Sequence, residues 1–207
     1  MAEGKRVLVT TYSPTFEMER GRESRVDGYL GVLRGETDPI VGEDFLLSEL
    51  SGEFPKGTEF SEHSDIFATT TFLDMLEIGR GTYDSVVLVN HFAPYATGLG
   101  STLSPTGMAD DASELIGRSI KNGLWKLRAA EVPVYVAEWI GYNSYSPLGK
   151  IAFPGDETGK TAAEVYGKML GDVGFSVEMV KRFDFEDGRL ERNDRSGEYI
   201  LMKAVPA

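Results

Sequence analysis

The stretch that decides the fold is residues 132–153, VPVYVAEWIGYNSYSPLGKIAF. It opens as a β-branched apolar run, with Val134 and Val136 following Pro133, and then passes through Gly141 into hydroxyl and aromatic side chains. A short apolar run bounded by turn residues predicts a buried strand over 132–138. Ligands of open α/β sheets lie outside the carboxyl ends of the strands, so the polar turn at 142–147 is where we expect the site.

The rest of the chain alternates between strand and helix patterns. Short β-branched runs predict strands at 6–12 and 85–90, and apolar residues at helical spacing predict helices over 26–33, 65–79, 111–130 and 161–171. We also expect a weak strand at 44–50, a long loop at 52–64, and an antiparallel hairpin made of 175–185 and 199–205.

This alternation predicts a single α/β domain spanning residues 1–207. We expect three α/β/α layers around a mixed, mostly parallel sheet. The strands that start at Arg6, Ser85 and Val132 should be central, and the antiparallel part should be C-terminal.

Composition limits the functions that the chain can have. A formal net charge of −12 argues against a nucleic-acid partner and an anionic membrane surface. The chain has no cysteine, which excludes disulfides and a cysteine nucleophile, and His63 and His91 are too far apart for a zinc motif. No Gly-x-Gly-x-x-Gly turn follows the first strand, so we expect no cofactor and no metal. Without a long apolar run or a signal-peptide core, we expect a cytoplasmic protein.

Four segments resemble the pyroglutamyl peptidase family. Residues 7–17, VLVTTYSPTFE, are similar to that family's first strand and loop, VLVTGFxPFGG. Residues 83–95 are similar to the strand that ends in its GQAGGR loop, and 104–110, SPTGMAD, to its TPERVAxN segment. Residues 119–153 are similar to its helix, Ala-Gly-Ile-Pro strand and Ala-Gly-x-x-x-Cys-Asn turn. The resemblance covers roughly residues 5–175 and implies the fold of that family.

The catalytic residues of that family are missing here. Its cysteine falls on Tyr145, its glutamate on Thr106, and its histidine near Val177. A tyrosine phenol, with a pKa of about 10, is a poor acyl-transfer nucleophile. We therefore predict that the protein is not a cysteine peptidase of this kind.

Three segments that follow predicted strands, 11–15, 90–94 and 138–146, are expected to converge on one site. For catalysis we expect His91 and Glu138 as an acid–base pair, assisted by Tyr142 or Ser144. The expected substrate-binding residues are Tyr12, Ser13, Asn90, Phe92, Asn143 and Tyr145. The Cα atoms of Tyr12, His91 and Tyr142 should then surround a cavity on the order of 300 Å³. In the alternative interpretation, the hydroxyl groups only satisfy turn backbones.

Two classes of function follow from these observations. In the first, the protein is a repurposed pyroglutamyl peptidase-like enzyme, hydrolase-like or cyclase-like, that acts on a small amide, lactam or related carbonyl compound without a cysteine nucleophile. In the second, it is a catalytically inactive relative that binds a small molecule or a protein. Under both we expect a small-molecule partner and a possible homo-oligomer, without nucleic acid or membrane.

Overall fold

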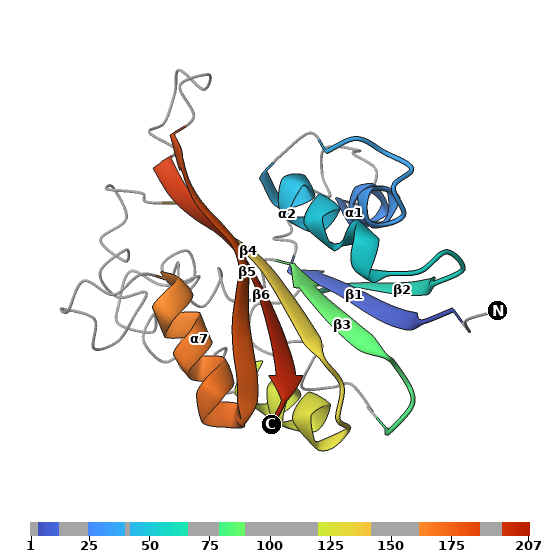
Figure 1. Cartoon of the computed structure of the whole chain (residues 1–207), viewed down its shortest axis with the longest axis vertical. Coiled ribbons are helices and arrows are strands. Elements are labelled where there is room, and N and C mark those ends of the chain that lie inside the picture. The colour runs from blue at the N-terminus through green and yellow to red at the C-terminus, as the bar shows by residue number, and fades with distance from the viewer. Residues whose placement is uncertain are drawn as a thin grey trace.

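The computed structural model describes residues 4–12, 25–39, 42–65, 79–89, 120–141, 162–186 and 196–207. Within these ranges six strands form one sheet in the order β2-β1-β3-β4-β6-β5 (Figure 1). The strands are β1 Arg6–Tyr12, β2 Glu59–Asp65, β3 Ser85–Val89, β4 Val134–Gly141, β5 Phe175–Glu186 and β6 Ser196–Pro206. Only β6 runs against the others in this sheet, because it pairs antiparallel with both β4 and β5. An α/β fold with a mixed, mostly parallel sheet is therefore confirmed.

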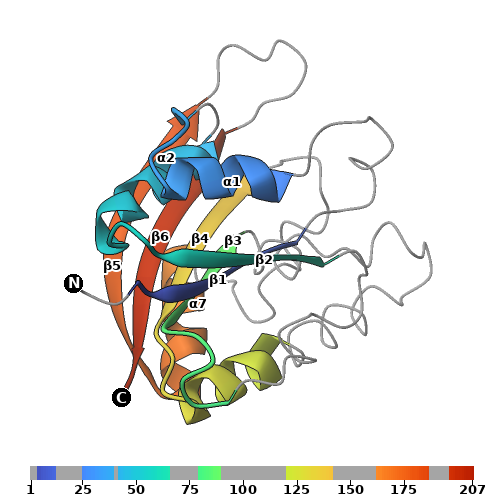
Figure 2. The same ribbon diagram turned by 90° about the vertical axis from the view of Figure 1, so that its right-hand side faces the viewer.

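Helices cover both faces of the sheet (Figure 2). One face carries α1, Arg25–Leu33, and α2, Gly42–Leu50, which is followed by the short helix η2, Ser51–Glu53. The other face carries α7, Ala162–Val173, and a helix whose described part covers 120–129.

Successive side chains of a strand point to opposite faces of the sheet, so alternate residues pack into the two cores. Val7 and Val9 pack with α1 and α2, whereas Leu8 packs with helix 120–129 and α7. This produces three layers with a core on each side of the sheet.

The direction in which strands are added reverses at β1. From β1 the chain passes through α1 and α2 to β2 on one side, while β3 and β4 lie on the other side of β1. Crossover connections share one hand, so connections that run in opposite directions place their helices on opposite faces. The carboxyl ends of β1 and β3 thus flank the switch point of a doubly wound sheet, where such folds bind ligands.

The strands predicted at 6–12, 85–90 and 132–138 are confirmed as β1, β3 and β4, and the C-terminal hairpin as β5 and β6. The helix over 26–33 is confirmed as α1 and that over 161–171 as α7. Of the helix expected over 111–130, residues 120–129 are described and helical, whereas 66–78 of the helix expected over 65–79 lie outside the described residues.

The strand predicted at 44–50 is wrong, because this segment belongs to helix α2. Leu46, Leu47 and Leu50 are all buried against the sheet, while Phe45 is 50% exposed. Burial at positions i, i+1 and i+4 is helical spacing, which a strand with alternating sides could not provide.

The loop predicted at 52–64 is also wrong from residue 59 onward, where β2 begins. This strand lies at the edge of the sheet and pairs only with β1. Its sequence, EFSEHSD, has a single apolar residue, Phe60, which packs against the core, and the strand is joined to the sheet by backbone pairing with β1.

Candidate functional site

The carboxyl edge of the sheet, where the parallel strands end, brings together four strands. Tyr12, the last residue of β1, pairs with Asp65, the last residue of β2. On the other side of β1, Thr11 pairs with Val89 at the end of β3, and Val89 pairs with Ala137 of β4. Because β4 continues to Gly141, it extends beyond β3 and forms one wall of this edge.

Two buried polar residues, Thr10 of β1 and Glu138 of β4, mark the same edge. Both side chains are 0% exposed, in a sheet whose other buried positions are almost all apolar. Glu138 lies two residues beyond Val136, and therefore on the face covered by helix 120–129 and α7. Burial of a carboxylate is costly unless it is paired, so such a group is a candidate for function.

Two of the residues predicted from sequence are placed at this edge. Tyr12 follows Thr11, and Glu138 follows Ala137, in two strands that both border β3. Two strand spacings separate them, roughly 10 Å between backbones. Eight further predicted residues lie outside the described ranges: His91, Tyr142, Ser144, Ser13, Asn90, Phe92, Asn143 and Tyr145. Their roles, and the cavity expected among Tyr12, His91 and Tyr142, stay predictions.

Asp65 is the residue that the sequence interpretation missed. It was assigned to a predicted helix because the preceding segment was interpreted as a loop, whereas it ends a strand next to β1. The signal that could have identified Asp65 is an acidic residue at the end of the strand that pairs with the first strand of the sheet. His63, interpreted as part of a solvated loop, pairs with Thr10 inside β2.

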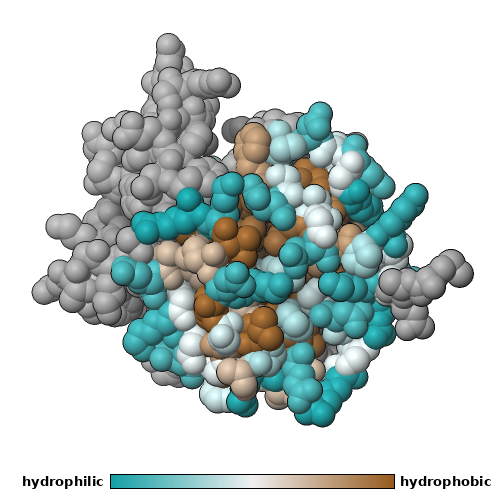
Figure 3. Space-filling model, in the orientation of Figure 1, coloured by the Kyte–Doolittle hydropathy of each residue, from teal (hydrophilic) through white to brown (hydrophobic). Residues whose placement is uncertain are grey.

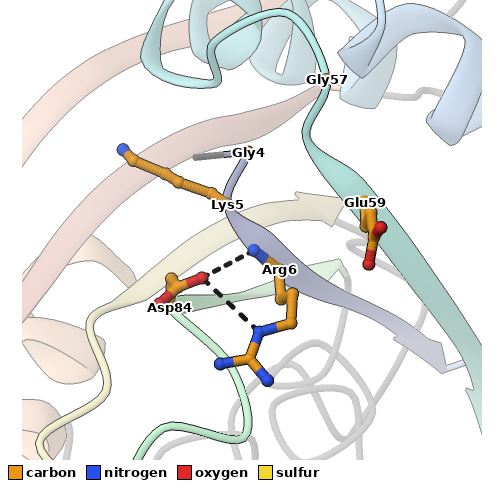
Figure 4. Close-up of a pocket in the computed structure, with 6 residues that line it drawn as sticks. All are labelled: Gly4, Lys5, Arg6, Gly57, Glu59 and Asp84. Carbon is orange, nitrogen blue, oxygen red and sulfur yellow. Dashed lines mark hydrogen bonds and ion pairs between the residues drawn. The ribbon is translucent and has the colours of Figure 1, made fainter. Parts of the chain in front are cut away.

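The opposite, amino edge of the sheet holds a shallow hollow of about 520 Å³ (Figure 4). Its lining residues are Gly4, Lys5, Arg6, Gly57, Glu59 and Asp84. The Arg6 amide donates a hydrogen bond to Asp84 Oδ2 at 2.7 Å, and the Arg6 guanidinium donates to the Gly81 carbonyl. These contacts join β1 to the turn before β3. Because the hollow is open and lies at the amino ends of the strands, we interpret it as structural.

A second polar group at the amino edge consists of Glu53, Tyr135 and Lys203, which we call the amino-edge cluster. The Tyr135 hydroxyl donates to Glu53 Oε2 at 3.1 Å, and Lys203 Nζ donates to the same oxygen at 3.2 Å. Hydrogen bonds from Lys203 and Tyr135 lower the pKa of Glu53, and the bond to Glu53 raises the pKa of Lys203. Burial raises the pKa of Tyr135. The cluster ties η2 to β4 and β6, since its members come from all three elements.

Within the described ranges, no three His, Cys, Asp or Glu side chains lie close enough together to hold a metal ion. In the same ranges, no helix is long and apolar enough to cross a membrane, and the cytoplasmic location stays a prediction.

Comparison with known proteins assigns no family to the chain. No family model and no curated protein matches it. Among solved structures, a 16S rRNA (adenine(1408)-N(1))-methyltransferase from Catenulisporales acidiphilia is similar at 15% identity and a TM-score of 0.44, over 100% of this chain and 90% of that one. A SAM-dependent methyltransferase from Methanosarcina mazei has 12% identity and a TM-score of 0.41, over 100% and 94%. Precorrin-6y C5,15-methyltransferase from Geobacter metallireducens has 7% identity and a TM-score of 0.35, over 99% and 82%. Likeness at this level assigns no function.

The resemblance to pyroglutamyl peptidases is wrong, because these structures are methyltransferases and no family model supports a peptidase. Two functions were derived from this resemblance, a repurposed peptidase-like enzyme and an inactive family relative. Both are contradicted for the same reason. The exclusion of nucleic acid is also contradicted, since an rRNA methyltransferase is among these structures. Net charge was a weak basis for it, because charges beyond about 8 Å are screened at physiological salt and the local surface decides.

Proposed function

We propose that this protein binds S-adenosylmethionine at the carboxyl edge formed by β1, β2 and β3, and that it is a methyltransferase. The observation that carries the proposal is the position of Asp65. It ends β2, pairs with the last residue of β1, and lies beside the point where the strand order reverses. In dinucleotide-binding folds, an acidic residue in the corresponding position accepts hydrogen bonds from a ribose. A ribose-bearing ligand therefore fits this edge.

The residues after β1 favour a ligand without phosphate. Residues 13–23, SPTFEMERGRE, contain a single glycine. A pyrophosphate is bound by close backbone approach at a glycine-rich turn and by a helix N-terminus, and this segment has no glycine-rich turn. S-adenosylmethionine has the ribose but no phosphate.

The absence of cysteine from the sequence is compatible with methyl transfer. S-adenosylmethionine supplies a methyl group already activated on its sulfonium, so no nucleophile from the protein is needed. What the protein must do is hold the acceptor in line with that methyl group and receive the proton that the acceptor loses. Glu138, buried in β4 one residue beyond the last pair of β3 with β4, is the residue we propose for receiving the proton.

Isothermal titration calorimetry tests the proposal, with S-adenosylmethionine and S-adenosylhomocysteine as ligands and NAD and ATP as phosphate-bearing comparisons. We expect the first two to bind and the others not to. The Asp65→Asn variant should bind about 10- to 100-fold more weakly, because hydrogen bonds to a charged acceptor are lost. Glu59→Gln is the matched control, since it changes a carboxylate at the amino end of the same strand. Absence of binding at millimolar ligand, or an equal effect of both variants, would refute the proposal.

A further inference from the structure

Helix 120–129 lies in a segment whose charge is opposite to that of the whole protein. Residues 115–130 contain four cationic residues, Arg118, Lys121, Lys126 and Arg128, and no acidic one. The segment thus carries a charge of +4, and the rest of the chain carries −16, which together give the net −12. Three of these four residues, Lys121, Lys126 and Arg128, lie in the described part of the helix.

The apolar and cationic residues of this helix occupy different faces. Ile120, Leu124 and Leu127 are 0% exposed and pack under the sheet with α7. Lys121, Trp125 and Arg128 follow them one position later, at i, i+4 and i+7, and so form a stripe along the helix. We call these three residues the Trp125 stripe.

Trp125 is 51% exposed, which is unusual for the largest aromatic side chain. The Arg128 guanidinium carbon lies 6.0 Å from the centre of the Trp125 ring, within cation–π range. Within the described ranges, the buried Nε of Arg128 has no hydrogen-bond partner. The ring is therefore held in place by a cation while one side stays open to solvent.

The described part of the helix contains no acidic residue. The next acidic residue along the chain, Glu131, accepts from the Arg80 guanidinium at 2.5 Å and is balanced by it. Lys121 and Arg128 therefore flank Trp125 with no acidic residue between them in the sequence.

We propose that the Trp125 stripe binds single-stranded nucleic acid. An exposed aromatic ring among cations is the arrangement on which a base stacks while flanking cations contact phosphates. The stripe spans roughly 10 Å along the helix, enough for one stacked base and its adjacent phosphates. An anionic membrane fits less well, because the apolar face that would enter it is already buried in the protein core. The proposal does not depend on methyltransferase activity.

Fluorescence anisotropy with labelled 12-nucleotide oligo(U) and oligo(dT) tests this inference on the full chain. We expect binding that weakens with salt, with a logarithmic slope of about −1.4 if Lys121 and Arg128 contact phosphates. Trp125→Ala should weaken binding by about tenfold or more through loss of stacking. Lys121→Glu should weaken binding and reduce the salt slope.

Lys56→Glu is the matched control, since it makes the same change of charge at an exposed lysine in the turn before β2. Circular dichroism and thermal melting will show whether each variant is folded. If the stripe variants bind no differently from Lys56→Glu, the inference is wrong. Binding to phosphatidylserine vesicles without binding to either oligonucleotide would overturn it in favour of a membrane surface.

Discussion

The amino-edge cluster allows a prediction whose size follows from the geometry. Replacing Glu53 by Gln keeps an oxygen that can accept from Tyr135 but removes the charge that Lys203 contacts at 3.2 Å. The side chains of Lys203 and Glu53 are 32% and 46% exposed, so solvent screens much of their attraction. Partly exposed ion pairs contribute about 0.2–1 kcal/mol, and a hydrogen bond to a charged acceptor adds to this. We expect Glu53→Gln to lower the free energy of unfolding by about 1 kcal/mol at pH 7.

The effect should depend on pH in a defined direction. The pKa of Glu53 is lowered from 4.5 in the folded protein, so its contribution is complete above 4.5 and is lost as the pH falls through the lower folded value. The pKa of Lys203 is raised from 10.5, so its contribution is complete below 10.5 and is lost only at higher pH. The difference between wild type and Glu53→Gln should therefore be constant from about pH 5 to 10 and shrink below pH 4.5.

Urea unfolding followed by circular dichroism between pH 3.5 and 7 measures this difference. Tyr135→Phe and the double variant complete a cycle, in which we expect a coupling free energy of at least about 0.5 kcal/mol. A difference that stays the same from pH 7 to 3.5, or a coupling of zero, would show that the three side chains do not act as one cluster.

Two substitutions elsewhere test the packing of the fold by urea unfolding. Gly174 has a φ of +96°, and a Cβ there would lie 2.8 Å from Arg128 Nε, so Gly174→Ala should destabilise the protein by about 1–3 kcal/mol. Its control, Gly171→Ala, adds a methyl group in open space within α7 and should be neutral or stabilising by up to about 1 kcal/mol. The buried Oγ of Ser85 has no hydrogen-bond partner in the part of the chain that the structure describes, so Ser85→Ala should be neutral or stabilising by up to about 1 kcal/mol. A loss above 1 kcal/mol in Ser85→Ala would mean that this hydroxyl is satisfied after all.

The central strands could be predicted because both of their faces are buried. Every residue of β3 is buried, and a strand covered on both sides by helices is a continuous apolar run in the sequence. The same reasoning located β1 and β4, and hence the edge at which Tyr12 and Glu138 end up. A strand that is buried on both faces can therefore be recognised from its apolar sequence.

The edge strand β2 could not be predicted, because its side chains show no strand-like apolar pattern. β2 is polar and exists through parallel backbone pairing with β1, which leaves no pattern of apolar residues. Because β2 was not predicted, Asp65 was not recognised as the last residue of a strand. That position, and not the residue type alone, makes Asp65 a candidate for ligand binding. The weak strand predicted at 44–50 is instead helix α2, in which the adjacent residues Leu46 and Leu47 are both buried against the sheet.

The family resemblance failed for a related reason. The matched segments were a strand with its following loop and a helix with its following strand, and such units occur throughout α/β proteins. Agreement in their order says that strands and helices alternate, which the structure confirms. It says little about the chemistry at the strand ends, where the family's cysteine, glutamate and histidine have no counterparts in this chain.

The two proposed sites are connected through helix 120–129. The described part of that helix directly precedes β4 and so ends toward the amino edge of the sheet, where β4 begins. Lys121 is therefore the member of the Trp125 stripe nearest to the proposed S-adenosylmethionine site, on the same face of the sheet as Glu138. The space-filling view shows hydrophilic residues over much of one face of the molecule and apolar residues gathered near the middle of that face (Figure 3). If both binding experiments succeed, the nucleic acid becomes the first methyl acceptor to test. If only one succeeds, the site that it tests is supported on its own.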